Sequence, residues 1–416
     1  MTHIHLILLP GLTGNLSRDL RLAYLTAKKL SLITKRRIRI AVVENLGRDL
    51  TYTYEKGLVK LIILGYSSHN ITGIFSKYVL RNQHLLPILF KILRYRVKDN
   101  KSNVNLVHSF YLYPTTFSVL LVMKLFRSLF ARTKLIASVV GIDVIACKEA
   151  KYGNLLNPIL NKLTRFTLEN VDVIHVHSDL AYKLVSKLCK GTYKLRYIPR
   201  FIDDAFLKNF KQYNLSNISA KKGIILLYYG RLAPFKNLRT LLTAFKYLKR
   251  HLNDKCIRIL VIGAKSDAEK KKLLSGVDPD IYIRKWKNSV EIAKILNNLL
   301  NDYLIVFTHP ALIDLGPKTI IEAMSLGLPI LITKTTGKPF EANDYPLLVT
   351  MRPTTNPQVM ASEIITGIRY ISKYLSERSE DILSETHRWR VQHAGKFTIV
   401  NVSTCLALLY LAEISV

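Results

Sequence analysis

The chain of 416 residues carries a formal net charge of +33 at pH 7, and 49% of its residues are hydrophobic. This length is more than one domain usually needs and predicts two, each with its own core. The four cysteines form no Cys-x-x-Cys pair, which argues against a disulfide framework or a zinc site. No apolar run reaches the ~18 residues of a spanning helix, and the first run ends at Pro10, so we expect no signal peptide and a cytoplasmic location.

The positive charge is concentrated in the first half of the chain. Residues 1–200 carry 32 Lys and Arg against 10 Asp and Glu, and residues 201–416 carry 30 against 19. Such an excess bears on partners rather than on fold, and anionic lipid headgroups, phosphate-bearing lipid carriers and nucleic acid all fit it. The alternative is a solvated, lysine-rich surface without a partner.

The first elements predict a strand, a glycine loop and a helix. The apolar run His3–Pro10 is typical of a buried parallel strand, and Arg18–Leu30 is typical of a helix. The loop between them holds Gly11 and Gly14, and a loop in this place lets phosphate groups approach the backbone closely. An ordinary tight turn has the same sequence features, so both interpretations stay open.

The next four segments continue the alternation of strands and helices. They are strands Ile38–Val43 and Val59–Leu64, helix Ile71–Leu80, and a basic amphipathic stretch, Leu85–Val97. This last stretch fits a helix that lies on a membrane surface. It fits equally a core helix with a basic outer face.

Three more strands and a helix complete the first half: Asn103–His108, Lys134–Val140 followed by Gly141-Ile142-Asp143, Val171–Val176 followed by Ser178, and helix Asp179–Leu188. His108 is either a hydrogen-bonded core histidine or a ligand contact. We place a domain boundary near residue 203, after the run Tyr197–Asp203.

A strong strand, Gly223–Tyr229, opens the second half and runs into Gly230-Arg231-Leu232-Ala233-Pro234-Phe235-Lys236-Asn237, before a helix over Leu238–Leu248. Arg231 and Lys236 therefore emerge at the carboxyl end of a strand, where open α/β sheets bind ligands. A fixed guanidinium and a mobile ammonium can neutralise a leaving diphosphate. The alternative is two surface cations without a ligand.

Two further strands, Arg258–Ile262 and Ile281–Trp286, follow that helix. Trp286 closes the second strand and either stacks on a nucleobase or packs against the neighbouring helix. An Asp-x-Asp segment, Asp278–Asp280, could hold a metal ion, but its position before a strand indicates a turn.

The segment 304–330 contains the most informative pattern. Leu304–Phe307 predicts a strand, and a helix follows at about 317–326 with Gly316 as its cap. Asp314 stands before this helix and Glu322 within it, while the loop N–H groups and the helix N-terminus favour an anion such as phosphate. An acid that accepts hydrogen bonds from sugar hydroxyls, beside a phosphate site, fits a sugar nucleotide.

Two motifs resemble those of the family-4 retaining glycosyltransferases, which share the GT-B fold. Asp314-x7-Glu322 followed by Ala-Met-Ser-x-Gly-x-Pro resembles their nucleotide-sugar motif, and Gly230–Asn237 resembles their Gly-Arg-x4-Lys-Asn. The chain departs from the family at Asp314, where Glu is usual, and at Val140, where a His that touches the transferred sugar is expected. Either this contact is lost, or His108 or a loop group supplies it.

The resemblance implies two doubly wound, Rossmann-like α/β domains that face a cleft. Residues 1–202, with a last helix at about 397–416 that packs back, would bind the acceptor, and residues 203–396 the nucleotide sugar. Arg231 and Lys236 would stabilise the leaving group, Glu322 would hold the ribose hydroxyls and Asp314 the donor sugar, without a cofactor or a metal. Further residues expected at the donor are Gly14, Gly230, Gly316, Pro317 and Trp286.

We therefore expect a retaining hexosyltransferase that moves a sugar from a nucleoside-diphosphate sugar to a glycan, lipid-linked or protein-linked acceptor, peripherally at an anionic inner membrane face. Two alternatives remain. One is an enzyme of the same fold that glycosylates DNA, suggested by the charge alone, and the other is a binding protein without turnover. The joint presence of Arg231, Lys236 and Glu322 argues against the second.

Overall fold

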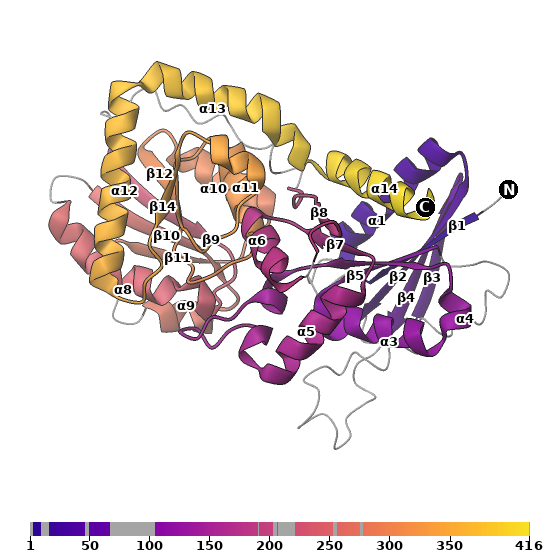
Figure 1. The fold of residues 1–416 in the computed structure, drawn as a ribbon. Helices are drawn as coiled ribbons and strands as arrows, with labels where there is room; N and C mark the ends of the chain where they lie inside the picture. The colour runs from indigo at the N-terminus through magenta and orange to yellow at the C-terminus, as the bar shows by residue number, and fades with distance from the viewer. Residues whose placement is uncertain are drawn as a thin grey trace.

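The computed structural model describes residues 3–9, 16–45, 50–66, 105–189, 191–202, 206, 221–252, 256–274 and 278–415. Within these residues the chain forms two α/β domains, each built on a sheet whose strands are mainly parallel (Figure 1). This architecture confirms the predicted fold class. Gly14, the helix expected at 71–80 and the amphipathic stretch 85–97 lie outside the described residues.

The first domain contains a sheet of eight strands in the order β3-β4-β2-β1-β5-β6-β7-β8. Neighbouring strands run parallel, except that β3 and β4 form an antiparallel hairpin at one edge. The strands are β1 (His3–Leu9), β2 (Arg37–Asn45), β3 (Leu50–Lys56), β4 (Val59–Tyr66), β5 (Leu106–Phe110), β6 (Lys134–Ser138), β7 (Val173–Val176) and β8 (Leu195–Tyr197).

Strand β3 is not predicted by the pattern of its sequence. Residues 51–56 of this strand are exposed, so it lacks the apolar face by which a buried strand is recognised. Gly57, at φ +59°, makes the tight turn into β4. Edge strands of this kind are set by their pairing with a neighbour rather than by their own apolar pattern.

Alternating side chains of β1 serve two cores, one on each face of the sheet. Leu6 and Leu8 pack with residues of α1 and of the last helix, α14, whereas Ile7 packs with residues of α3, α5 and α6. Such double burial explains why the strand is an unbroken apolar run. The helices of this domain are α1 (Leu16–Thr34), α3 (Phe117–Leu125), α4 (Arg127–Phe130), α5 (Pro158–Asn170) and α6 (Asp179–Leu188).

The second domain contains six parallel strands in the order β11-β10-β9-β12-β13-β14. The chain adds β10 and β11 on one side of β9 and then β12 on the other, so the strand order reverses between β9 and β12. Open α/β sheets bind ligands at the carboxyl ends of the strands at such a point. The strands are β9 (Gly223–Tyr229), β10 (Cys256–Ala264), β11 (Ile281–Lys285), β12 (Tyr303–His309), β13 (Ile330–Thr333) and β14 (Leu348–Met351).

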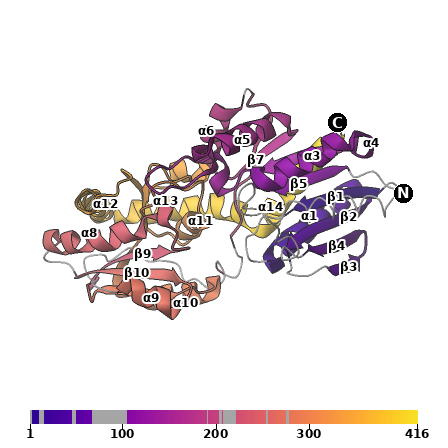
Figure 2. The ribbon, with the colours of Figure 1, turned by 90° about the horizontal axis from the view of Figure 1, so that it is seen from below.

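Helices cover both faces of the second sheet, with α8 and α12 on one side of β9 and β10 and with α9 and α10 on the other (Figure 2). Helix α8 buries leucines and a phenylalanine three or four residues apart, and this spacing gives it one apolar face. The helices are α8 (Leu238–His251), α9 (Asp267–Leu274), α10 (Ser289–Leu299), α11 (Lys318–Ser325), α12 (Pro357–Glu377) and α13 (Ser379–His393).

The C-terminal helices connect the two domains. From α12 the chain runs through α13 into α14 (Ile399–Ser415), which lies beside α1 in the first domain (Figure 1). Val402, Leu406 and Tyr410 of α14 are buried in the same core as Leu30 of α1. None of the helices in the described part of the chain combines the length and the apolar character that crossing a membrane requires.

Candidate active site

The predicted cations directly follow β9, at the switch point of the second sheet. Gly230 adopts φ +150°, and a Cβ added to Gly263, near the end of β10, would lie 2.0 Å from the Gly230 carbonyl oxygen. The Tyr228 hydroxyl donates to the Arg231 carbonyl oxygen at 2.7 Å. These contacts fix the backbone of the turn, while the Arg231 residue itself is exposed.

Lys236 ends a short 3-10 helix, Pro234–Lys236, and is buried. Asn237 follows at φ +60°, and its side-chain amide donates to the carbonyl oxygens of Pro310 at 3.2 Å and Thr354 at 2.7 Å. Asn237 therefore joins the motif after β9 to the segment after β12. Asparagine suits this position because it tolerates a left-handed backbone better than most residues do.

The Lys236 ammonium forms an ion pair with the Asp314 carboxylate, whose side chain is 13% exposed. The same carboxylate oxygen lies 2.9 Å from Nε2 of His309, the last residue of β12. The structure thus brings together two predicted residues and adds His309, which the sequence analysis does not single out. Its signal in the sequence is a histidine at the carboxyl end of a buried strand, directly before Pro310.

The members of this Lys236–Asp314–His309 cluster shift one another's pKa values. Burial raises the pKa of Asp314, but Lys236 and His309 lower it more, so that it lies well below its usual range. Burial lowers the pKa of His309, with Lys236 acting in the same direction and Asp314 against it. Asp314 is therefore ionised and His309 neutral at pH 7, so Nε2 of His309 donates to Asp314. Its buried Nδ1 has no hydrogen-bond partner among the described residues.

Glu322 is held separately from this cluster. Its side chain is 5% exposed on α11, and the Lys318 ammonium, one turn earlier, lies 2.8 Å from its carboxylate. The Tyr229 hydroxyl donates to the Thr319 carbonyl oxygen at 3.1 Å, which joins α11 to the end of β9. The two predicted acids therefore have different lysine partners, Lys318 for Glu322 and Lys236 for Asp314.

The loop before α11 contacts the first domain. The sequence predicts Gly316 as the helix cap, but the cap is Pro317 and the helix begins at Lys318. The shift arises because Gly316 makes a turn at φ +131°, where a Cβ would lie 3.0 Å from Cβ of Ser178. The Ser178 hydroxyl donates to the Leu315 carbonyl oxygen. The missing side chain of Gly316 thus makes room for the first domain.

A second contact between the domains lies beside this loop. The Asp179 amide donates to the Lys338 carbonyl oxygen at 3.0 Å, and the Lys338 amide donates to Oδ1 of Asp179 at 2.8 Å. The Tyr197 hydroxyl donates to the Glu341 carboxylate at 2.8 Å. These groups hold the ends of β7 and β8 against the second domain.

The remaining donor residues proposed from sequence lie apart from the cluster or outside the described residues. Trp286 follows β11, at the edge of the sheet, and its amide donates to the Ala264 carbonyl oxygen at 2.8 Å. Its side chain is 54% exposed, so the ring is not buried against a helix. Gly14 cannot be placed relative to the site because it lies outside the described residues.

His108 is a core residue. Its Nδ1 lies 2.6 Å from the Tyr410 hydroxyl and its Nε2 lies 2.7 Å from the Ser138 hydroxyl. The chain continues from Ser138 to Nδ1 of His175 at 2.7 Å, and from Nε2 of His175 to the Ile198 carbonyl oxygen at 3.0 Å. With both ring nitrogens engaged and no exposed surface, His108 does not face a ligand.

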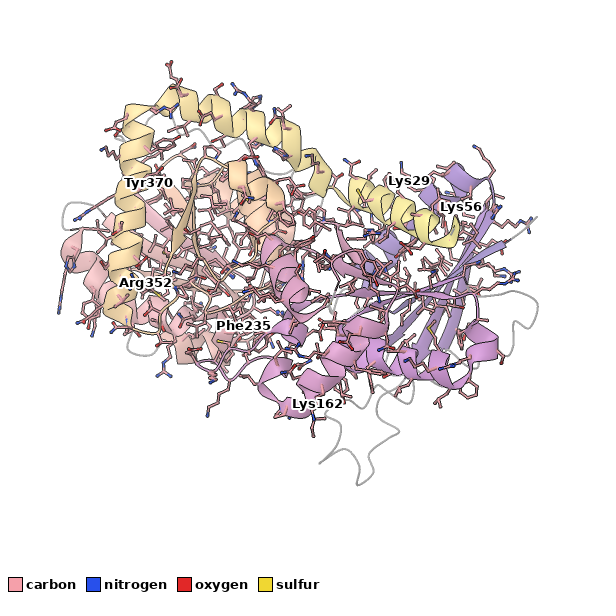
Figure 3. All side chains as sticks on the ribbon, in the orientation of Figure 1. Lys29, Lys56, Lys162, Phe235, Arg352 and Tyr370 are labelled. Atoms are coloured by element: carbon pink, nitrogen blue, oxygen red, sulfur yellow. The ribbon has the colours of Figure 1, made fainter. Side chains whose placement is uncertain are left out.

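An aromatic pair joins the two domains at the site. The rings of Tyr152, from the first domain, and Phe235, from the second, stack with centroids 4.1 Å apart and planes at 17° (Figure 3, where Phe235 is labelled). Phe235 stands directly before Lys236 in the motif after β9. Sequence reasoning misses this pair because no local pattern connects residues of two different domains.

Among the described residues, no group of three or more His, Cys, Asp or Glu side chains is arranged to hold a metal ion. Asp278 and Asp280 face Lys249 instead, with ion-pair distances of 3.1 and 2.7 Å. The Asp278 carboxylate also accepts the Asp280 amide at 3.0 Å, as in an Asx turn.

Comparison with solved structures shows the fold. The chain is similar to a sucrose-phosphate synthase from Thermosynechococcus elongatus, at 15% identity and a TM-score of 0.68, over 99% of each chain. A glycosyltransferase from Rickettsia africae is similar at 16% identity and a TM-score of 0.61, also over 99% of each. Anabaena HepE in complex with UDP is similar at 11% identity and a TM-score of 0.58, over 98% of this chain and 100% of that one.

Comparison with protein families shows the relationship. Residues 211–364 match the model of the family described as glycosyl transferases group 1, while the search of curated proteins gives no match. The matched segment contains the predicted residues Arg231, Lys236, Asp314 and Glu322. Over this segment, which spans most of the second domain, the chain is similar to the glycosyl transferases of group 1, and over its whole length it has the two-domain fold of the solved GT-B glycosyltransferases.

Proposed function

We propose that this enzyme moves a hexosyl group, with retention of configuration, from a nucleoside-diphosphate sugar to an acceptor bound by the first domain. The observation that supports the proposal is the buried Lys236–Asp314–His309 cluster. It combines a cation for a phosphate with an acid for sugar hydroxyls, and it lies at the strand ends of the switch point.

Arg231 and Lys236 would act on the diphosphate. Arg231 is exposed and forms no ion pair with another described residue, so it can meet a phosphate directly, whereas Lys236 is paired with Asp314. A bound diphosphate would compete with Asp314 for the ammonium group, and the ammonium would then stabilise negative charge that develops on the leaving oxygen. Asp314 would in turn be freed to accept hydrogen bonds from the donor sugar.

Glu322 would hold the nucleoside. Its buried carboxylate can accept from both hydroxyls of a ribose, and the N–H groups at the start of α11 favour the adjoining phosphates. In the transfer step the bond from the anomeric carbon to the phosphate oxygen breaks, and the acceptor oxygen bonds to that carbon on the same face. The departing phosphate oxygen takes the proton of the acceptor hydroxyl, so this step needs no base from the protein.

A panel of nucleotide sugars tests the donor side. HepE has been solved with UDP-glucose as well as with UDP, which makes uridine nucleotides the first to try. We expect one nucleoside diphosphate to raise the Tm of the protein. The corresponding nucleotide sugar should be hydrolysed slowly in the absence of an acceptor. If no nucleotide sugar protects the protein or is hydrolysed, the proposed function is wrong.

For the acceptor we propose a molecule at an anionic membrane surface, reached through the α3–α5 face. This name covers the exposed surface of α3, of Phe126 after it and of α5; Leu125, Phe126 and Ile159 are exposed by 76%, 41% and 69%. Lys124 directly precedes Leu125, and Lys162 lies three residues after Ile159 and points away from the molecule in Figure 3. Exposed apolar side chains between cations suit the interface of an anionic bilayer.

A further inference from the structure

Tyr152 of the first domain stacks on Phe235 of the second, beside the cations assigned to the donor. Phe235 is buried, and its carbonyl oxygen accepts from the Leu312 amide at 2.9 Å. The Lys236 ammonium lies 5.1 Å from the centre of the Phe235 ring. The ring of Tyr152 thus packs on the side chain of the residue that directly precedes Lys236 and whose backbone is bonded to the segment leading to Asp314.

The turn 147–153 holds Tyr152 in a fixed position. Cys147 and Tyr152 exchange two backbone hydrogen bonds, at 2.8 and 3.0 Å. Lys151 adopts φ +48°, and Gly153 adopts φ +121°, where a Cβ would lie 2.0 Å from the Ile145 carbonyl oxygen. Position 153 requires a glycine because of its positive φ and because of the close Ile145 carbonyl oxygen. The backbone of the first domain therefore fixes Tyr152 in the position in which it contacts the second domain. A residue that binds a ligand needs such a fixed position.

The surroundings of the Tyr152 hydroxyl come from both domains. On the first-domain side, a Cβ added to Gly141 would lie 3.7 Å from the hydroxyl oxygen. Burial raises the pKa of Tyr152 to about 12, with Arg231 lowering it and Asp314 raising it. The hydroxyl is therefore protonated at pH 7 and lies within the field of two residues assigned to the donor. Among the described residues, the hydrogen bonds of Tyr152 are those of its backbone with Cys147, and its hydroxyl forms none.

We propose that the Tyr152 hydroxyl contacts the transferred sugar from the first domain and helps to set which sugar is accepted. Val140 leaves the turn at Gly141 without a hydrogen-bonding side chain, and His108 is buried in the core. Tyr152 brings a hydroxyl to that turn from a neighbouring loop. The inference rests on the proposed function, because it concerns the sugar of the same donor.

The test compares Tyr152→Phe with Tyr370→Phe. The first variant keeps the ring on Phe235 and removes the hydroxyl. The second removes a hydroxyl from a ring that is also stacked, on Tyr374 at 5.7 Å, but that lies on α12 away from the site (Figure 3). The probes are the nucleoside diphosphate and the nucleotide sugar that protect the wild type in the panel described above, with UDP and UDP-glucose tried first and GDP and GDP-mannose next.

We expect Tyr152→Phe to keep the Tm and to bind the free diphosphate within about twofold of the wild type. Its kcat for donor hydrolysis should fall by about tenfold, the effect of one lost hydrogen bond. The ratio of its kcat for the donor to its kcat for the nucleotide sugar that is epimeric at C4 should also move closer to one. Tyr370→Phe should match the wild type in Tm, diphosphate affinity, kcat and this ratio.

Two results would overturn the inference. One is a kcat and a donor preference that stay within about twofold of the wild type. The other is a loss of affinity for the free diphosphate as large as the loss in kcat, which would place Tyr152 at the nucleotide. A wild type that is protected by none of the nucleotide sugars in the panel described above, and hydrolyses none of them, would refute the proposed function, and this inference with it.

Discussion

Lys236 and Asp314 stand 78 residues apart in the chain and form a buried ion pair, with side chains 8% and 13% exposed. One residue follows β9 and the other follows β12, the two strands between which the sheet order reverses. Removing one partner of such a pair leaves the other charge buried without compensation. This relationship separates Lys236 from Arg231, which is exposed.

Alanine variants of the two cations should therefore differ in stability although both lose activity. Arg231→Ala should lower turnover by about a hundredfold, the cost of roughly 3 kcal/mol for a lost charged donor, and leave the Tm unchanged. Lys236→Ala should lower turnover at least as much and also lower the free energy of unfolding by about 3 kcal/mol. Steady-state kinetics and urea unfolding measure both effects. Near-normal turnover in both variants would show that Arg231 and Lys236 do not stabilise the leaving group.

The hydrogen-bonded residues His108, Ser138 and His175 in the core of the first domain predict that the stability of the protein falls in acid. Burial lowers the pKa of His175 to about 4, and Arg200 acts in the same direction. An unfolded histidine titrates near 6.5. Between these values the unfolded chain binds more protons, so stability should fall as the pH drops from about 6.5 to about 4, by roughly 3 kcal/mol for this imidazole.

A non-ionisable variant isolates this contribution. Glutamine can accept from Ser138 and donate to the Ile198 carbonyl oxygen, so His175→Gln preserves the kind of contact that the imidazole makes. Thermal unfolding followed from about pH 7 to about pH 4 should show a smaller drop in Tm for the variant than for the wild type. Equal drops would mean that other groups determine the acid sensitivity.

The order of strands and helices can be predicted from the sequence because each buried parallel strand appears there as an unbroken run of apolar residues. The β9 turn, with Arg231 and Lys236, is predictable for the same reason, since a strand and a helix frame it in sequence. Contacts between distant segments are not predictable in this way. His309 lies only five residues before Asp314, but a loop without helical or strand periodicity joins them, so no pattern in the sequence indicates their contact. The space that Gly316 leaves for Ser178 is recognised only when both domains are seen.

Activity should persist in excess chelator. Asp278 and Asp280 are engaged by Lys249, and the leaving group would be neutralised by Arg231 and Lys236. A donor-hydrolysis assay with and without a chelator measures this directly. Complete loss of activity on chelation, restored by manganese, would instead direct attention to the two aspartates.

The α3–α5 face should bind anionic vesicles in a salt-sensitive manner, at about 1 kcal/mol per engaged cation. Leu125→Ser combined with Ile159→Ser should weaken binding, because these changes remove the two most exposed of the three apolar side chains named on this face. The control is Val391→Ser, which removes a side chain that is 70% exposed on α13, in the second domain. Co-sedimentation over a salt series measures the effect. Indifference to lipid charge would reject the membrane proposal, and tighter binding to duplex DNA would favour the alternative acceptor.

The two acids should separate in their effects on free nucleoside diphosphate. Glu322 is proposed to hold the ribose, through hydrogen bonds worth about 1.5–3 kcal/mol, and these exist before and during transfer. Glu322→Ala should therefore weaken binding of the free diphosphate as well as of the donor. Calorimetry with the diphosphate alone measures this loss.

Asp314→Ala should act differently, because Asp314 competes with the diphosphate for Lys236. Removal of the carboxylate leaves the ammonium unpaired, so affinity for the free diphosphate should stay the same or rise, while the Tm and the turnover fall. Asp314→Glu, which restores the acid usual in this family, adds a methylene beside His309 and should lower turnover by crowding a buried site. If Asp314→Ala loses as much diphosphate affinity as Glu322→Ala, Asp314 serves the nucleotide rather than the sugar. The loop 311–317 would then be part of the nucleotide site.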